Sequence, residues 1–97
     1  MTRVLHTRAE LRAALADVER PVGLVPTMGW LHDGHRSLMR RARAEDATTV
    51  VTIFVNPRQF DDASDYTQYP RDTAADLAIC ESEGVDLVWV PAVEEVY

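Results

Sequence analysis

The sequence contains no lysine, and all ten of its basic residues are arginines. This absence excludes the phosphate-binding P-loop, because its motif, GxxxxGK[ST], requires a lysine that reaches the phosphates. The four glycines show no GxGxxG arrangement either, so a dinucleotide cofactor is disfavoured. If this chain handles a nucleotide, it uses a different set of phosphate-binding groups.

Cysteine is almost absent: Cys80 stands alone, so no disulfide can form within the chain. A reducing, cytoplasmic location is therefore expected. Cys80 has the chemistry of a nucleophile, but its place on the apolar side of an expected helix favours a small buried side chain. No apolar stretch approaches the roughly 20 residues of a membrane span. The N-terminus also lacks a signal-peptide core, and we expect no membrane partner.

Basic charge is scarce in the second half of the chain. Residues 1–48 hold eight arginines against six acidic residues, residues 49–97 hold two against ten, and the net charge is −6. This balance argues against nucleic acid as a partner. Four arginines in one predicted helix look like a solvated face, because no aromatic residues alternate with them: Arg36, Arg40, Arg41 and Arg43. The length of 97 residues and an apolar content of 46% indicate at most one small domain.

The stretch MGWLHDGH, residues 28–35, organises the chain. It follows an apolar run, residues 22–25, and precedes an amphipathic run, residues 36–44, so it lies where a strand gives way to a helix. A helix N-terminus at such a junction offers unpaired backbone N–H groups and a positive dipole end to an anion. The stretch is therefore interpreted as a site for the phosphates of ATP.

Two histidines and a glycine give this stretch its chemistry. His32 and His35 supply donors whose charge changes near neutral pH. Gly34 between them lets the backbone come close to a ligand. The HxGH pattern alone is short, and two histidines at this spacing could also ligate a metal or have no ligand at all.

Apolar periodicity predicts helices between Thr7 and Pro21, over residues 35–46, and between Asp72 and Gly84. Thr7 and Glu10 have the spacing of a capping box. The inward side chains of the second and third helices are expected to be Leu38, Met39, Ala42, Ala74, Leu77, Ala78 and Cys80. Strands are predicted over residues 22–25 (stopped by Pro26), 48–55 and 85–90. A polar loop is expected over 61–70, and a further helix is expected to begin within 93–97.

Strands that alternate with helices predict an α/β fold with parallel strands and right-handed crossovers, the first half of a doubly wound sheet. Ligands of such sheets bind at the carboxyl ends of the strands. Asn56, Arg58 and Gln59 follow the strongest predicted strand, and Gln59 offers both donors and an acceptor. The two imidazoles and the Gln59 amide are therefore expected to converge on one crevice.

Several segments together resemble the pantothenate synthetases (pantoate–β-alanine ligases). They are PTMGWLHDGH (26–35), SL (37–38), IFVNPRQF (53–60), DY and YPRD within 65–72, DLA (76–78), EGVDLVWVP (83–91) and VEEVY (93–97). The combination of PTMGxLHxGH with FVNPxQF is far more specific than HxGH alone. The wider resemblance is to the HxGH nucleotidyltransferase superfamily, which includes the class I aminoacyl-tRNA synthetases, and it implies a Rossmann-like fold.

The resemblance implies a two-step reaction. ATP and pantoate give pantoyl adenylate and pyrophosphate, and β-alanine then displaces AMP to give pantothenate. His32 and His35 are the implied catalytic residues, with His35 as the proton donor. The implied ATP-binding residues are Met28, Gly29, Trp30, Leu31, His32, Asp33, Gly34 and His35. The implied pantoate-binding residues are Pro26, Thr27, Met28, Asn56, Gln59 and Tyr69, with Gln59 also binding β-alanine. Mg²⁺ is implied by ATP; its ligands are not, and Asp76 is only a guess.

The chain departs from the family in two ways. Trp30 stands where the family usually has a small residue. Family members are also much longer, so the resemblance implies that residues 1–97 are the N-terminal part of the nucleotide-binding domain, without the C-terminal lid domain or the active-site lysine. We expect this chain alone to be impaired or inactive as a ligase.

Two alternatives stay open at this point. One is a truncated fragment that keeps partial pantoate or ATP contacts without turnover. The other is a different HxGH nucleotidyltransferase. The family resemblance also implies a homodimer, and an unpaired sheet edge is expected to cause self-association.

Overall fold

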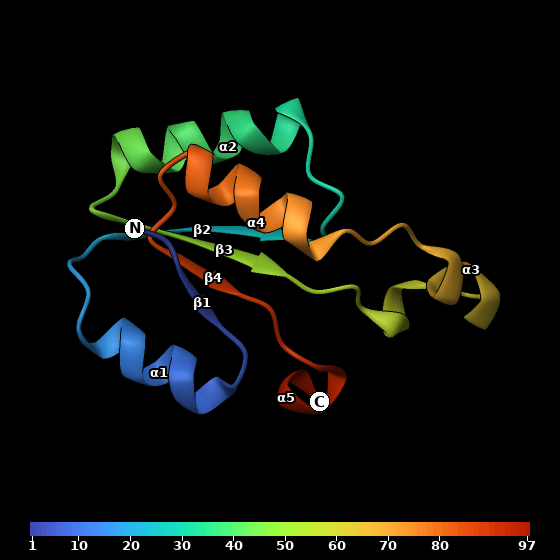
Figure 1. Ribbon diagram of the computed structural model, residues 1–97. Helices are drawn as coiled ribbons and strands as arrows, with labels where there is room; N and C mark the ends of the chain where they lie inside the picture. Colours follow the sequence, from blue (N-terminus) through green and yellow to red (C-terminus); the bar gives the residue numbers. More distant parts are fainter.

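A four-stranded parallel sheet, in the order β1-β4-β3-β2, forms the centre of the computed structural model, which describes residues 1–97. The strands are β1 (Arg3–Leu5), β2 (Val22–Thr27), β3 (Thr48–Ile53) and β4 (Leu87–Trp89). The helices are α1 (Arg8–Ala16), α2 (Asp33–Glu45), α3 (Ala63–Gln68), α4 (Thr73–Ser82) and α5 (Val93–Val96), with a 3₁₀ turn, η1, at Pro57–Gln59. Helices α2 and α4 lie on one face of the sheet and α1 on the other (Figure 1). The predicted α/β class and Rossmann-like parallel sheet are confirmed.

Each face of the sheet has its own apolar cluster. Under α2 and α4 the buried residues are Val25, Met39, Ala42, Val51, Ile53, Cys80, Val85 and Val88. Under α1 they are Leu5, Ala14, Val50 and Leu87. Val50 and Val51 are thus buried on opposite faces, as side chains of a central strand alternate. Two-sided burial explains why β3 has an almost wholly apolar sequence.

Strand β1 lies at the N-terminus, where no strand was predicted. It pairs in parallel with β4. Only Leu5 of its three residues is buried. A three-residue segment is too short to show an alternation of apolar and polar residues or a long apolar run. Its extended conformation comes from pairing with a strand more than 80 residues away in the chain.

Residues 61–70 were predicted as a polar loop, and this prediction is wrong for the six residues of α3. Asp62 caps the helix, because its side chain accepts a hydrogen bond from the backbone N–H of Ser64 at 2.8 Å. No residue of α3 is buried, so the helix has no apolar stripe that periodicity could detect. It stands away from the sheet (Figure 1).

Some of the side chains predicted to point inward are exposed. Met39 is fully buried as expected, but Leu38 is 53% exposed because β2, which lies beneath this side of α2, is the last strand of the sheet. On α4, Ala74 and Ala78 are exposed. Asp76 takes their place on the inner side, next to the buried Cys80.

Three of the four arginines of α2, Arg40, Arg41 and Arg43, are exposed as predicted, whereas Arg36 is half-buried. Arg36 and Arg40 both bind the Glu83 carboxylate, with N–O distances of 2.7 and 2.8 Å. Arg43 donates to the Glu83 backbone carbonyl at 3.2 Å. Hydrogen bonds from Arg40 and Arg36 hold the pKa of Glu83 below its usual value. The cluster joins α2 to the end of α4.

Strand β2 continues through Pro26, which was predicted to stop it. The prediction is wrong because β2 is an edge strand. The Thr27 carbonyl accepts from Phe54 on the β3 side, so the neighbouring Pro26 directs its missing donor away from β3, where no ladder bond is lost. The predicted parallel pairing of residues 22–25 is confirmed, with partners Thr48–Val51. None of the helices combines the length and the apolar composition that a membrane span requires.

The free edge of β2 predicts self-association. Leu24 is 61% exposed there, close to the exposed Leu38, and an apolar strand edge pairs readily with another chain. In sedimentation velocity we expect an average mass that rises with concentration above the 10.9 kDa of one chain. A Leu24→Lys variant should sediment as a monomer, and Ala74→Lys on exposed α4 should not change the mass. A monomer at every concentration for the unaltered chain would refute this expectation.

Candidate active site

The loop between β2 and α2 has an unusual backbone. Gly29 and Trp30 both lie in the left-handed region, with φ values of +79° and +53°. Such a value costs little for glycine and is uncommon for a tryptophan. The Thr27 hydroxyl accepts from the Gly29 N–H at 3.1 Å and donates to the Thr52 carbonyl at 2.9 Å. The loop is therefore tied to the end of β3 at its first turn.

Asp76 of α4 holds the other side of this loop. Its two carboxylate oxygens accept from the backbone N–H groups of Trp30 and Leu31, at 3.1 and 2.9 Å. The residue is only 3% exposed. A Cβ added to Gly29 would lie 2.9 Å from the carboxylate, so glycine is needed for this close approach. Asp76 therefore fixes the path of the chain into α2.

These contacts do not fit Asp76 as a ligand of Mg²⁺. Both of its oxygens are already engaged by the loop backbone. No group of three or more histidine, cysteine, aspartate or glutamate side chains could hold a metal ion anywhere in the chain. Asp76 is therefore not assigned as a magnesium ligand.

His32 and His35 form a reciprocal cap at the N-terminus of α2. The Nδ1 atom of His32 accepts from the Gly34 N–H at 3.0 Å, and the Nδ1 atom of His35 accepts from the His32 N–H at 3.2 Å. An imidazole nitrogen that accepts carries no proton, so the neutral ring carries its proton on Nε2. Each histidine therefore keeps an Nε2–H donor that the cap does not use.

Gly34 makes room for this arrangement. A Cβ at this position would lie 2.9 Å from the Cε1 atom of His32. The sequence suggested that the glycine serves the approach of a ligand, and the structure shows that it accommodates the histidine ring. The rings of His32 and His35 have centroids 4.1 Å apart.

The pKa of His35 is lowered from 6.5, first by burial and next by His32, against an opposing effect of Asp76. The folded chain therefore binds fewer protons than the unfolded chain just below pH 6.5. The stability due to this residue is present above pH 6.5, and it is lost as pH falls through 6.5 toward the folded pKa.

Urea unfolding between about pH 5 and 8 measures this dependence. His35→Gln is the matched control, because glutamine at this position still accepts from the N-cap backbone but does not titrate. We expect the free energy of unfolding of this variant to depend less on pH. An unchanged slope in His35→Gln would contradict the role assigned to His35.

A cleft of about 510 Å³ opens at the carboxyl ends of β2 and β3. Its lining residues are Pro26, Thr27, Met28, Gly29, His35, Thr52, Phe54, Asn56, Gln59 and Tyr69. None of them is an acid, a lysine or an arginine, and most of their polar groups are hydroxyls, amides and an imidazole. The cleft is suited to a small polar molecule, with an apolar wall from Met28 and Phe54.

The structure brings together every residue that the resemblance implied for pantoate: all six line this cleft, and so does His35. The expected meeting of His35 with Gln59 is therefore present. The expectation that both imidazoles meet Gln59 is wrong for His32, which does not line the cleft. Thr52 and Phe54 were missed, although each lies within one residue of the carboxyl end of β3.

Trp30 and Leu31 face away from the cleft. They line a separate cavity of about 180 Å³ beside α4, together with Asp72, Ala75, Asp76 and Ile79. The indole is 53% exposed. The tryptophan therefore turns outward and does not fill the cleft.

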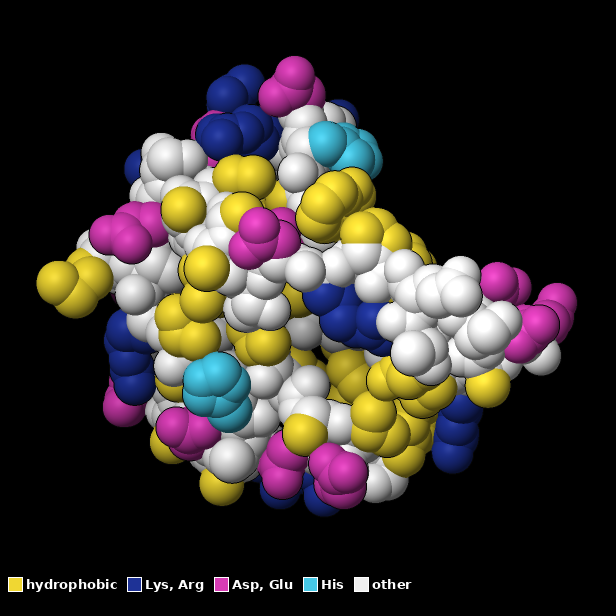
Figure 2. All heavy atoms as spheres, turned by 45° about the vertical axis from the view of Figure 1, so that its right-hand side comes forward, with side chains coloured by type: hydrophobic (Ala, Val, Ile, Leu, Met, Phe, Trp, Pro, Cys, Tyr) yellow, Lys and Arg dark blue, Asp and Glu magenta, His cyan; other side chains and the backbone are white.

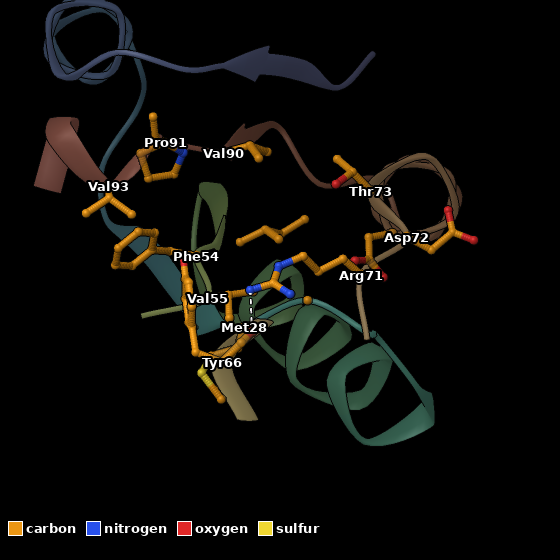
Figure 3. Close-up of a pocket in the computed structure, with 14 residues that line it drawn as sticks. Met28, Phe54, Val55, Tyr66, Arg71, Asp72, Thr73, Val90, Pro91 and Val93 are labelled. Carbon is orange, nitrogen blue, oxygen red and sulfur yellow. Dashed lines mark hydrogen bonds between the residues drawn. The ribbon is translucent and has the colours of Figure 1, made fainter. Parts of the chain in front are cut away.

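A second cavity, of about 220 Å³, adjoins the cleft between the ends of β3 and β4 and the α3 segment. Arg71 extends into it beside Tyr66 (Figure 3). Its guanidinium donates to the carbonyls of Tyr66, Thr67 and Tyr69, at 2.8 to 3.2 Å. Arg71 thus secures the α3 segment, which projects from the body with a hollow at its base (Figure 2). The sequence signal for this role was the YPRD segment alone.

Cys80 is fully buried, as the sequence indicated. Burial raises the pKa of its thiol to about 11, and Asp76 acts in the same direction. A thiol in this state is a poor nucleophile near neutral pH. This thiol therefore carries no role in the chemistry of the cleft, which it does not line.

Comparison with known proteins gives a consistent result. Residues 3–97 match the family model described as pantoate-beta-alanine ligase. The chain is 58% identical over 95 residues to a pantothenate synthetase of Roseiflexus sp. (strain RS-1), covering 98% of this chain and 34% of that protein. It is also 58% identical over 94 residues to the pantothenate synthetase of Acidothermus cellulolyticus, covering 97% of this chain and 31% of the relative. The chain thus spans about a third of the length of these relatives.

Solved structures of the same family are similar to this chain in fold. The pantothenate synthetase of Thermus thermophilus superposes with a TM-score of 0.89 at 50% identity, covering 100% of this chain and 34% of that one. The Francisella tularensis pantoate-beta-alanine ligase, described as complexed with beta-gamma ATP and beta-alanine, has a TM-score of 0.96 at 33% identity, covering 100% and 38%.

Proposed function

The chain belongs to the pantoate–β-alanine ligase family, and from this membership we propose that it serves the ATP-dependent condensation of pantoate with β-alanine. Pantoate and ATP give pantoyl adenylate and pyrophosphate, and β-alanine then displaces AMP to form pantothenate. We propose that residues 1–97 supply the N-terminal, nucleotide-binding part of this enzyme. The observation that carries the proposal is the cleft in which His35, Asn56 and Gln59 face one space.

The N-terminus of α2 is the proposed phosphate site. Its free backbone N–H groups and positive dipole end attract an anion, and α2 has 13 residues over which the peptide dipoles align. The Nε2–H donors of His32 and His35 add to this attraction. As pantoate attacks the α-phosphate and pyrophosphate leaves, negative charge builds on the phosphate oxygens, and donors already in place stabilise it.

The cleft between the ends of β2 and β3 is the proposed pantoate site. Gln59 and Asn56 offer amide groups to the carboxylate and hydroxyls, and Met28 and Phe54 offer apolar surface to the methyl groups of pantoate. Because His35 lines the same cleft, a carboxylate bound there lies beside the group proposed for the phosphates. Proximity of the two reactants lowers the barrier of the first step.

Gln59 supports a direct test. Gln59→Ala is expected to weaken pantoate binding about 5-fold or more, because a site that hydrogen-bonds a polar ligand loses about 1–3 kcal/mol when one partner is removed. Calorimetric titration of pantoate measures the change, and ATP titration provides the control, which should be unaffected. Gln68→Ala is the matched control, since Gln68 is exposed on α3 and does not line the cleft. Equal pantoate affinity for Gln59→Ala and the unaltered chain would remove Gln59 from the site.

A second candidate is binding without turnover, and it is favoured by the chain's span of about a third of its relatives' length. Release of pyrophosphate from ATP and pantoate by the 97-residue chain separates the two: binding of both ligands without release supports the second candidate. Release with other acids but not with pantoate contradicts both. The homodimer and the cytoplasmic location are also proposals.

A further inference from the structure

Asn56 has an unusual set of contacts for a residue that lines the cleft. Its side-chain oxygen Oδ1 accepts from the Arg58 backbone N–H at 3.0 Å and from the Tyr97 hydroxyl at 2.8 Å. The first bond caps η1 and is local. The second joins residues 41 positions apart in the chain.

The Arg58 contact settles which end of the amide is which. A backbone N–H can only donate, so the Asn56 atom that faces it must be the oxygen and cannot be the nitrogen. With two donors on it, the oxygen has used both lone pairs. The amide NH₂ group of Asn56 is therefore the part of the side chain left to interact with a molecule in the cleft.

Tyr97 is itself held in place by contacts of a different kind. The Arg58 guanidinium lies over the Tyr97 ring, 3.6 Å from its centroid. The Phe54 ring is tilted against it, with centroids 6.2 Å apart. These contacts leave the hydroxyl directed at Asn56. The end of α5 thus reaches the carboxyl end of β3, although β4 precedes α5 in the chain.

We propose that Tyr97 is a positioning residue: its hydroxyl fixes Asn56 so that the cleft presents the amide NH₂, a donor, to a carboxylate or hydroxyl oxygen of the substrate. The inference rests on the proposed function, since it names the group of the pantoate site that donates hydrogen bonds to oxygen atoms of the substrate. It also predicts a preference of the cleft for ligand groups that accept hydrogen bonds. A ligand group that donates hydrogen bonds, such as an ammonium, finds no acceptor at Asn56.

Tyr97→Phe tests the proposal, because it removes the hydroxyl and keeps the ring against Arg58 and Phe54. Tyr66→Phe is the matched control, since the Tyr66 ring contacts Phe60 and Arg71 and its hydroxyl holds no residue of the cleft. The first readout is the ¹⁵N relaxation of the Asn56 side-chain NH₂ signals in the full chain without ligand. We expect these signals to report an ordered group in the unaltered chain and in Tyr66→Phe, and a mobile group in Tyr97→Phe.

The second readout is pantoate affinity by calorimetry. Tyr97→Phe is expected to weaken binding about 3–10-fold, the range for one hydrogen bond, and Tyr66→Phe to leave it unchanged. In an Asn56→Ala background, Tyr97→Phe should cause no further loss, because Tyr97 acts through Asn56. A merely structural tyrosine would weaken binding by the same factor in both backgrounds.

Two results overturn the inference: an Asn56 NH₂ group that stays equally ordered in Tyr97→Phe, or an equal loss of affinity in both backgrounds. If the unaltered chain binds no pantoate at all, the proposed function fails instead. The relaxation measurement then still decides whether Tyr97 fixes Asn56.

Discussion

Replacing Asp76 with alanine is expected to lower the free energy of unfolding by about 3 kcal/mol, since each hydrogen bond to a charged group contributes about 1.5 kcal/mol or more. The carboxylate is the shared acceptor for the backbone N–H groups of Trp30 and Leu31. Without it, two donors lose their partner at a buried position, and the left-handed turn at Gly29 and Trp30 loses its support. Urea unfolding measures the change.

Two further variants sharpen this test. Asp76→Asn keeps the size of the side chain but places an NH₂ group opposite one backbone donor, so it should recover less than half of the loss. Asp61→Ala, at an exposed position, should change the stability by no more than about 0.5 kcal/mol. Hydrogen exchange of the Trp30 and Leu31 amides should accelerate in Asp76→Ala. A stability within about 0.5 kcal/mol of the unaltered chain would show that the loop does not depend on Asp76.

Replacing His35 with alanine is expected to slow the release of pyrophosphate from ATP and pantoate by about 10²–10³-fold, the usual effect of losing one preorganised donor to a developing charge. His35 lines the cleft, and because its Nδ1 atom is engaged by the helix cap, Nε2–H is its free donor. Labelled ATP makes slow release measurable for the 97-residue chain.

A second variant separates helix capping from catalysis at the neighbouring histidine. Asparagine caps a helix well but has no imidazole, so His32→Asn keeps the cap and removes the Nε2–H donor. It should unfold at the same urea concentration as the unaltered chain while releasing pyrophosphate more slowly. A His35→Ala rate within a factor of about two of the unaltered rate would exclude His35 from the stabilisation of charge.

The strand ends were the part of the site that the sequence predicted well. A parallel sheet places the residues that follow each strand at one edge, so Thr27 and Asn56 had to lie near each other once β2 and β3 were recognised. Five of the six residues implied for pantoate share one cleft for this reason, whereas Tyr69 lies at the end of α3 and follows no strand. Their binding of pantoate stays a prediction.

The contacts that hold the site together were not predictable in the same way. Asp76 was only a guess for a metal ligand, and its actual partners are 45 and 46 positions away in the chain. The contact of Tyr97 with Asn56 depends on the position of α5, which is set by where β4 ends in the sheet. Periodicity reports which residues face the core, and it carries no information on which polar group meets which across such distances.

The histidine cap illustrates a different limit of prediction from the sequence. HxGH was interpreted as a ligand motif, and the helix was predicted to begin at His35. It begins at Asp33, because His32 takes the N-cap position that serine, threonine, asparagine or aspartate usually fills. The same side chains thus start the helix and offer donors, and only the geometry of Nδ1 separates the two roles.

The central claim is that the space framed by His35, Asn56 and Gln59 binds the carboxylate substrate. Chemical-shift mapping of the ¹⁵N-labelled chain during a pantoate titration tests it most directly. The account predicts saturable shifts at the backbone amides of Thr27 and His35 and at the side-chain amides of Asn56 and Gln59, with little change around α1. Saturable shifts confined to other surfaces, or none at any pantoate concentration, would contradict it.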